Sequence, residues 1–454
     1  MLIRLPWLNS RKRLLAALVI DSALFAGLYP LCFRLRFDTW PDISFPLGLL
    51  LLFWLVSSYV HGRYFDHDDP RANAVIKQLV GSLLALAVSM AVYLLYNWIT
   101  ANGLGLPDSR SLLLPFLALL SLISAAAQLA LNALLRLQFE LPSRWLLLGS
   151  PEGAAALQQA ALWSRLQCRV EQARPETLCD LEPLVADPDL AGVVVENPQH
   201  LETELFEQLL ELQSQGLAVV STLGWCERVL QRFPPALLNR FDLVRGDFAI
   251  PGGSLQRRLK RLGDVLVSSL LLLLTLPLLL LAALLIRLED RGPVFYSQLR
   301  SGLGGEPFRM WKLRSMRVDA ERSGAQWAGR GDSRITAVGR WLRLTRLDEL
   351  PQLVAVIDGS MSLIGPRPER PEFEQELERQ IPYYRLRHRI RPGLSGWAQV
   401  NYPYGASVED AANKLSYDLY YLRNFSFWLD LLILVKTMRL VFNAKGAVPV
   451  EGSG

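Results

Sequence analysis

The chain is poor in cysteine and histidine, with four of each among 454 residues. Cys32, Cys168, Cys179 and Cys226 show no Cys-x-x-C spacing, and the histidines are scattered along the sequence. Paired or clustered cysteines and histidines are what build disulfide frameworks and zinc sites. Their rarity and spacing argue against both and indicate reduced thiols.

No tyrosine is followed four residues later by a lysine. Membrane-bound nucleotide-sugar dehydratases and epimerases need that pair, in which the lysine lowers the pKa of a tyrosine base. They also need an intact glycine-rich dinucleotide fingerprint. The candidate turn Gly149–Gly153 has Pro151 where the second glycine would stand. Both absences argue against this class of enzyme.

Long apolar runs, by contrast, are abundant, and 51% of the residues are hydrophobic. Four runs are each long enough to cross a bilayer core of about 30 Å. They cover residues 14–33, 43–60, 75–99 and 112–135. We expect an N-terminal four-helix transmembrane bundle over residues 1–141, without a cleavable signal peptide, because the first run is too long for one and lacks a small-residue cleavage site.

Basic residues flank the predicted bundle at both ends, which indicates that both ends face the cytoplasm. They are Arg4, Arg11, Lys12, Arg13, Arg136 and Arg144. Asp21 lies within the first apolar run. An acid at this depth is either functional or a hydrogen-bond partner of a serine or threonine on another helix.

Residues 142–250 change in composition, with fifteen Asp and Glu against eight Arg and Lys. Strand-like runs at 145–148, 192–196 and 217–221 alternate with helical patterns at 154–166 and 202–215. Such alternation predicts a small parallel α/β sheet. Because Pro151 removes an N–H from the first turn, a degenerate Rossmann-like domain with a structural or regulatory role is favoured over a working nicotinamide site.

A third part, residues 251–454, opens with a basic stretch that leads into an uncharged run at 265–286. The run contains Pro277, and basic residues, among them Arg258 and Arg287, stand on both sides of it. Both ends therefore favour the cytoplasmic face, and proline kinks a helix. These facts together predict a re-entrant membrane helix that enters and leaves on one side.

Asp348 and Glu349 are adjacent carboxylates in the most basic stretch of the chain. Residues 291–350 hold twelve Arg and Lys against six Asp and Glu. Such a pair is usually a solvated salt-bridge cluster. Here it stands near two stretches rich in Gly and Pro, at 358–368 and 391–400, each with an arginine, and downstream of the basic stretch 308–316. Surrounding cations keep a carboxylate ionised and can hold phosphate, which suits phosphoryl transfer.

Four motifs in the third part carry a resemblance to a known family. They are Lys312-Leu-Arg-Ser-Met316, Leu347-Asp-Glu-Leu-Pro-Gln352, Met361-Ser-Leu-Ile-Gly-Pro-Arg-Pro368 and Pro392-Gly-Leu-Ser-Gly-Trp-Ala-Gln-Val400. From about residue 255 to 444 the chain resembles the bacterial sugar transferases, monotopic polyisoprenyl-phosphate hexose-1-phosphate transferases. Its whole architecture is similar to the long-form members, with four N-terminal helices and a degenerate Rossmann-like domain. It departs from many members in having Leu276, not serine, before Pro277.

The resemblance implies that Asp348 attacks the sugar-bearing phosphate of a UDP-sugar, releases UMP and passes the phospho-sugar to undecaprenyl phosphate. It implies that Glu349 binds Mg²⁺, and that further residues contact phosphate or substrate. Those residues are Lys312, Arg314, Arg343, Arg346, Arg367, Arg391 and Asp418. It also implies a multi-pass protein of the bacterial inner membrane whose catalytic domain faces the cytoplasm. Such a protein would act in exopolysaccharide, capsule or O-antigen synthesis. Its expected partners include membrane lipid and exclude nucleic acid.

Several points stay open at this stage. A non-catalytic scaffold of a polysaccharide assembly complex is the alternative function, and homodimerisation is undecided. No motif indicates which sugar the protein recognises. Residues 416–442 mix aromatic and basic side chains, which suits either a helix in the lipid headgroup layer or a packed amphipathic helix. The tail 446–454 is expected to be disordered.

Overall fold

In the computed structural model the chain divides into two compact units, Met1–Leu141 and Pro142–Gly454. The structure describes residues 12–42, 45–61, 63–64, 71–100, 109–139, 143–164, 168–173, 187, 189–197, 199, 201–238, 243, 248, 255–320, 332–402 and 407–442. Arg4, Arg11, Cys179 and the tail 446–454 lie outside the described residues. The division of the chain into three domains, with a boundary at residue 250, stays a prediction.

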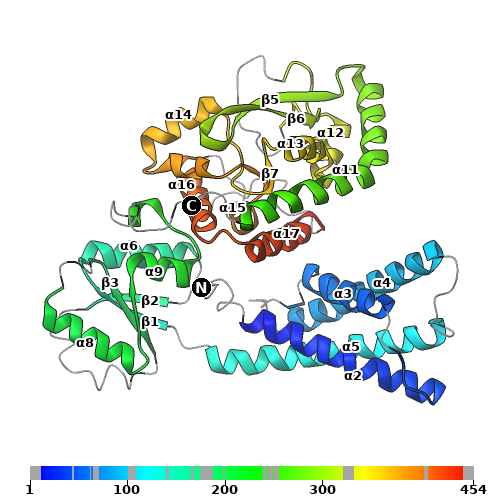
Figure 1. Cartoon of the computed structure of the whole chain (residues 1–454), viewed down its shortest axis with the longest axis horizontal. Coiled ribbons are helices and arrows are strands. Elements are labelled where there is room, and N and C mark those ends of the chain that lie inside the picture. The colour runs from blue at the N-terminus through cyan, green and yellow to red at the C-terminus, as the bar shows by residue number, and fades with distance from the viewer. Residues whose placement is uncertain are drawn as a thin grey trace. The chain divides into compact units, whose positions relative to one another are not determined.

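The described residues of unit Met1–Leu141 form four helices, α2 (Lys12–Phe37), α3 (Phe45–Val60), α4 (Arg71–Thr100) and α5 (Ser109–Phe139). Helix α2 packs along α5 and α3 along α4 (Figure 1). Their shared core includes the fully buried Trp54 and Phe116. By length and composition, Leu14–Phe37 and Leu112–Leu131 could cross a membrane, while the apolar parts of α3 and α4, Pro46–Val60 and Gln78–Tyr93, are shorter.

Asp21 is completely buried in this bundle and accepts hydrogen bonds from several side chains. Its carboxylate lies 2.5 Å from Ser124 Oγ, 2.7 Å from Tyr64 Oη and 2.9 Å from Gln128 Nε2. Arg63 Nη1 forms an ion pair with it at 3.4 Å. The structure therefore supports the hydrogen-bonding role for Asp21, because its oxygens are engaged by α5 and by the residues after α3.

The α/β part of the second unit has four parallel strands in the order β2-β1-β3-β4. These are β1 (Ser143–Leu148), β2 (Cys168–Gln172), β3 (Leu190–Val195) and β4 (Ala218–Ser221), joined with α6 (Pro151–Trp163), α8 (Thr203–Ser214) and the short α9 (Thr222–Trp225). In register, Leu147 of β1 pairs with Gln172 of β2 and Val194 of β3. The expected parallel sheet is present.

The turn between β1 and α6 holds an internal carboxylate. Ser150 N donates to Glu196 Oε2 at 2.6 Å. A Cβ added to Gly149 or Gly153 would lie 2.2 or 2.7 Å from that carboxylate, so a larger residue at either position would displace the Glu196 side chain. Glu196 thus occupies the N-terminus of α6, where dinucleotide-binding domains hold a pyrophosphate. This favours a structural or regulatory role for the domain.

Helix α11 (Leu255–Asp290) starts the remaining part of the unit and contains Pro277. Its ribbon runs in two directions joined by a bend (Figure 1). Most of its leucines are exposed, and by composition it could span a membrane. Ala282 and Ile286 instead pack on Leu313 and Leu342 in a small core. The re-entrant arrangement in a membrane stays a prediction.

Short elements follow α11. The antiparallel hairpin β5 (Phe295–Ser301) and β6 (Pro307–Leu313) pairs Phe295 with Leu313. After it come α12 (Ala337–Thr345), the 3₁₀ turn η6 (Leu347–Gln352) and α13 (Leu353–Asp358). The parallel pair β7 (Ser362–Ile364) and β8 (Gly393–Ser395) brackets α14 (Pro371–Gln380) and η7 (Tyr384–Arg389).

The segment 416–442 is not one helix. It belongs to α16 (Val408–Arg423) and α17 (Phe427–Phe442), which follow α15 (Trp397–Asn401). Tyr420 and Tyr421 on α16 are buried, whereas Phe427 and Trp428 on α17 are 58% and 52% exposed. The packed-helix interpretation therefore fits α16, and only α17 presents aromatic side chains suited to a lipid interface.

Candidate active site

Helix α12 brings the acid pair against the β5–β6 hairpin. Its N-cap Thr336 accepts a hydrogen bond from Gly339 N at 2.9 Å. Gly339 touches the backbone after β6 so closely that an added Cβ would lie 2.0 Å from Ser315 O. The helix ends at Arg346, which has a left-handed backbone with φ of 58°. That conformation costs a non-glycine residue about 1–2 kcal/mol and starts the turn η6 that carries Asp348 and Glu349.

Glu349 is held by three cations. Its Oε1 lies 2.7 Å from Arg367 Nη2, 3.2 Å from Lys312 Nζ and 3.9 Å from Arg346 Nη1. Burial opposes the charged form, yet Arg367 and Lys312 keep the pKa of Glu349 well below its usual value. Glu349 is therefore ionised at neutral pH and fixed by charge-assisted hydrogen bonds. Within the part of the chain that the structure describes, no contact involves its second oxygen, Oε2.

Asp348 differs from its neighbour. It is 7% exposed, and its Oδ1 is buried without a hydrogen-bond donor among the described residues. Burial and then the adjacent Glu349 raise the pKa of Asp348 to about 6, against the opposing charges of Lys312, Arg343 and Arg346. The expected effect of the surrounding cations thus prevails at Glu349, whereas at Asp348 burial and the neighbouring acid outweigh it. A buried carboxylate oxygen without a donor is a strong acceptor or nucleophile.

The other basic residues expected at the site lie in different places. Arg343 donates from Nε to Ser315 Oγ at 3.0 Å and lies close enough to lower the pKa of Asp348. Arg314 instead forms an ion pair with Asp290 at the end of α11, and its buried Nη1 has no acceptor among the described residues. Arg391 is exposed, and among the described residues its side chain forms no ion pair. The structure thus brings Lys312, Arg343, Arg346 and Arg367 to the acid pair.

Asp418 belongs to a second, buried cluster centred on Arg387. Arg387 Nη2 lies 3.0 Å from Asp418 Oδ2 and donates to Arg367 O at 2.8 Å. Burial raises the pKa of Asp418 to about 6, against the effect of Arg387. Asp418 therefore reaches the acid pair indirectly, through Arg387 and the backbone of Arg367.

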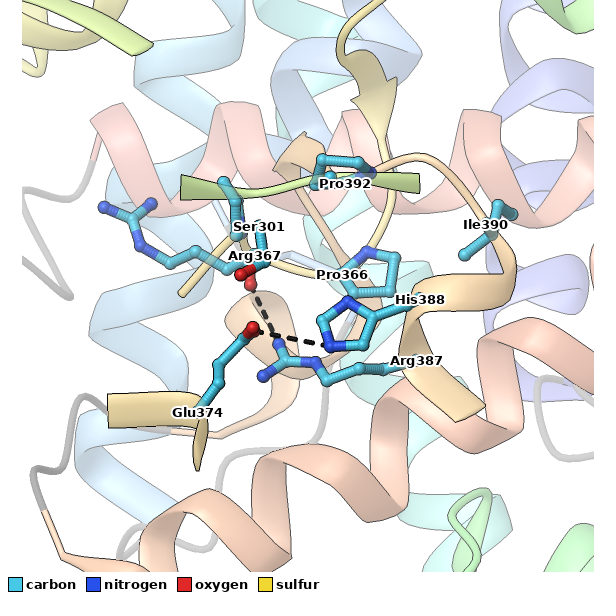
Figure 2. A pocket seen from close by; sticks show the side chains of 10 residues that line it. Ser301, Pro366, Arg367, Glu374, Arg387, His388, Ile390 and Pro392 are labelled. Atoms are coloured by element: carbon cyan, nitrogen blue, oxygen red, sulfur yellow. Dashed lines mark hydrogen bonds and ion pairs between the residues drawn. The ribbon is translucent and has the colours of Figure 1, made fainter. Parts of the chain in front are cut away.

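Figure 2 shows Arg387 beside a cavity of about 10 Å³, which is also lined by Ser301, Pro366 and Ile390. Glu374 and His388 point toward one another across it, with 3.5 Å between Oε1 and Nε2. The Arg367 side chain points away from the cavity, so its guanidinium is available to Glu349 (Figure 2). The cavity has room for about one water and is therefore too small to be a substrate pocket. We interpret the side chains around it as a support for the Arg367 backbone.

The sequence did not single out Arg387, and no spacing signal distinguishes it. It stands in a basic stretch with Arg385, Arg389 and Arg391, and only burial marks it as different. Two contacts of α11 were also missed. Asp264 accepts from Ser362 Oγ at 2.8 Å and Leu363 N at 3.1 Å, and Arg261 Nη2 donates to Ile357 O at 2.6 Å. These bonds attach the predicted membrane helix to the ends of α13 and β7.

Comparison with known proteins agrees with this arrangement. Residues 255–444 match the family model described as bacterial sugar transferase. The chain is 48% identical over 189 residues to a UDP-N-acetylgalactosamine-undecaprenyl-phosphate N-acetylgalactosaminephosphotransferase of Aeromonas hydrophila, covering 42% of this chain and 45% of the relative. It is 39% identical over 199 residues to a UDP-glucose:undecaprenyl-phosphate glucose-1-phosphate transferase of Escherichia coli, covering 43% of each.

The match to these two relatives spans less than half of their length. A shorter relative is covered more fully: a UDP-glucose:undecaprenyl-phosphate glucose-1-phosphate transferase of Caulobacter vibrioides is 44% identical over 194 residues, which make up 41% of this chain and 73% of the relative. The four motifs, the buried acid pair and this coverage lead to one assignment. The chain belongs to the bacterial sugar transferase family.

Proposed function

We propose that this protein transfers a sugar 1-phosphate from a UDP-sugar to undecaprenyl phosphate and releases UMP. The observation that carries the proposal is the acid pair, in which Glu349 is fixed by cations while the buried Oδ1 of Asp348 has no donor among the described residues. The names of the relatives give the substrate classes.

In the first step, an oxygen of Asp348 attacks the phosphorus that bears the sugar. The bond from that phosphorus to the bridging oxygen breaks, and UMP leaves with the bond's electron pair. An aspartyl phospho-sugar intermediate forms. In the second step, a phosphate oxygen of undecaprenyl phosphate attacks the same phosphorus, and the Asp348 carboxylate leaves. A carboxylate nucleophile thus divides one difficult displacement into two easier ones.

The cations around the pair have a defined task in this scheme. Lys312, Arg343, Arg346 and Arg367 would hold phosphate oxygens and offset the charge that develops on them. Arg367 and Lys312 already hold Glu349 ionised. Bidentate guanidinium contacts would also orient the phosphate in line with Asp348. Catalysis of phosphoryl transfer depends mainly on such positioning of the reacting groups.

Mg²⁺ fits the donor set of this site. Magnesium takes hard oxygen ligands and typically binds through one or two carboxylates together with waters and substrate phosphate. Glu349 Oε2 and the unpartnered Oδ1 of Asp348 are oxygens of this kind. Bound there, the ion would neutralise negative charge on the donor's diphosphate. We assign Glu349 as its principal protein ligand.

The surroundings suit a lipid acceptor. Helix α11 exposes leucines along most of its length, with Leu273, Leu274 and Leu280 each 64–68% exposed. Asp264 and Arg261 tie that helix to β7 and α13, next to the acid pair in the chain. We infer a re-entrant helix in the bacterial inner membrane that holds the site at its cytoplasmic surface, where nucleotide sugars are found.

The test is UMP release by purified protein in nanodiscs, with undecaprenyl phosphate, Mg²⁺ and a panel of UDP-sugars that includes glucose and N-acetylgalactosamine. Release with one sugar that depends on lipid acceptor and metal would establish the reaction and identify the donor. No release from any donor, by folded protein with lipid that is active in a parallel assay, would overturn the proposal.

A further inference from the structure

The segment that begins with α9 connects the α/β part to the C-terminal helices. It comprises α9, the π-helical turn η3 (Cys226–Leu230) and residues 231–238, and we call it the connecting segment. Trp397 Nε1 donates to Gln231 O at 3.0 Å, and Phe233 N donates to Ser416 O at 2.8 Å. Arg423 and Glu227 form an ion pair at 3.4 Å. The segment is therefore attached to both α15 and α16.

Arg232 is the buried centre of this attachment. The residue is 3% exposed, and its guanidinium reaches in two directions. Nη2 donates to Ala160 O on α6 at 3.0 Å, and Nη1 donates to Asn413 Oδ1 on α16 at 2.9 Å. The ring of Tyr417 lies 5.7 Å from its Cζ. Among the described residues Arg232 forms no ion pair with a carboxylate, so two neutral acceptors and a ring compensate the burial of its charge.

Helix α16 continues from this contact to the active site. Asp418, one turn beyond Asn413 and Lys414, forms the ion pair with Arg387. Arg387 in turn donates to Arg367 O at 2.8 Å, and Arg367 Nη2 donates to Glu349 Oε1 at 2.7 Å. A continuous series of polar contacts thus runs from α6 of the α/β part to the acid pair.

We propose that Arg232 is a positioning residue for the active site: it fixes α16 so that Asp418 and Arg387 hold Arg367 against Glu349. The proposal rests on the proposed function only for its kinetic consequence. Simple packing between two parts of the chain would need an apolar side chain, whereas a guanidinium with one acceptor on each side sets the distance and angle between them. Directional bonds of this kind transmit position.

The first test needs no substrate. Hydrogen–deuterium exchange is measured on the full-length protein in nanodiscs for the wild type and for Arg232→Met, which keeps the length of the side chain but not its donors. Arg228→Met is the matched control, because Arg228 lies in the same connecting segment, on η3, and is exposed. We expect faster exchange at residues 408–423 and 365–368 in Arg232→Met only. Unchanged exchange in both regions would overturn the proposal, whatever the enzyme's activity.

The second test is kinetic. We expect Arg232→Met to lower kcat for UMP release by about ten- to a hundredfold, the range for small displacements of catalytic groups, with little change in KM. Asn413→Asp keeps an acceptor for Arg232 and should stay within about twofold of the wild type, while Asn413→Leu should match Arg232→Met. An active wild type with an equally active Arg232→Met would overturn the positioning role. An inactive wild type would count against the proposed reaction, and the exchange experiment would still decide on Arg232.

Discussion

Arg367 and Glu349 form the closest ion pair at the site, with 2.7 Å between Nη2 and Oε1, while the backbone carbonyl of the same arginine accepts a hydrogen bond from Arg387. Arg367 is thereby held through both its side chain and its backbone carbonyl. Glu349 gains a fixed cationic partner, and Asp348, one residue earlier, keeps an oxygen that no described residue occupies. This asymmetry between two adjacent acids suits each to a different chemical role.

Replacing Asp348 with Asn should abolish turnover, because an amide cannot act as the nucleophile. We expect UMP release to fall by about 10⁴-fold or more, as for the loss of other covalent nucleophiles. Circular dichroism and the thermal unfolding midpoint control for folding. Normal turnover by Asp348→Asn would refute the nucleophile assignment.

Replacing Glu349 with Gln should also lower kcat strongly, by about 10²–10³-fold, because the expected Mg²⁺ ligand loses its charge. Isothermal titration of Mg²⁺ into wild type and variant in the presence of a UDP-sugar provides a separate measurement. Removing metal with EDTA should stop the wild-type enzyme, and added Mg²⁺ should restore it. Equal magnesium affinity in both proteins would contradict the ligand assignment.

The rate should depend on pH through Asp348. The nucleophile must be ionised, and its pKa is raised to about 6, so the active form is present above this pH and is lost as the pH falls through it. We expect kcat/KM to decline below pH 6 by about tenfold per unit well into the acid range. Arg343→Met removes a charge that lowers the pKa of Asp348, and should therefore move the decline to higher pH. A profile that is flat from pH 5 to 8 would exclude this titration.

Both ends of α11 should face the cytoplasm. Single cysteines beside Arg258 and Arg287, introduced into a variant without the four native cysteines, should both react with a membrane-impermeant maleimide only after the inner membrane is opened. A cysteine in the loop between the first two predicted membrane helices, near Trp40, serves as the opposite-side control. Labelling of the two α11 positions from opposite sides would show that the helix crosses the bilayer.

Asp21 should contribute to stability and not to catalysis. Asp21→Ala leaves Arg63 buried without its carboxylate, and breaking a buried pair costs about 3–5 kcal/mol. Thermal unfolding in detergent should therefore shift clearly downward. Ser22→Ala, which removes only a bond to Leu18 O, should change the midpoint little. The double variant Asp21→Ala with Arg63→Met should recover part of the loss.

The sequence predicted local features well. The four N-terminal helices and the helix over 265–286 follow from the length of apolar runs, and the parallel sheet follows from the alternation of strand-like and helical patterns. The motifs also identified Lys312, Arg343, Arg346 and Arg367, which the structure brings to the acid pair.

Long-range pairing was harder to predict. Arg314 shares a motif with Lys312 yet forms its ion pair with Asp290, because it lies one residue beyond the end of β6 and strand alternation no longer determines the direction of its side chain. Asp418 and Arg387 are 31 positions apart, and only the packing of α16 on η7 joins them. The burial of Asp348 was likewise missed, since a count of nearby charges contains no information about desolvation.

The carboxylate at the β1–α6 turn has a consequence for how this protein responds to the cell. A domain whose phosphate-binding turn is filled by a diffusible nucleotide gains stability by mass action, so its population of folded molecules follows the nucleotide concentration. Here Glu196 is part of the same chain and is present at a constant effective concentration. We therefore expect the stability of this turn to be independent of the nucleotide concentration in the cell.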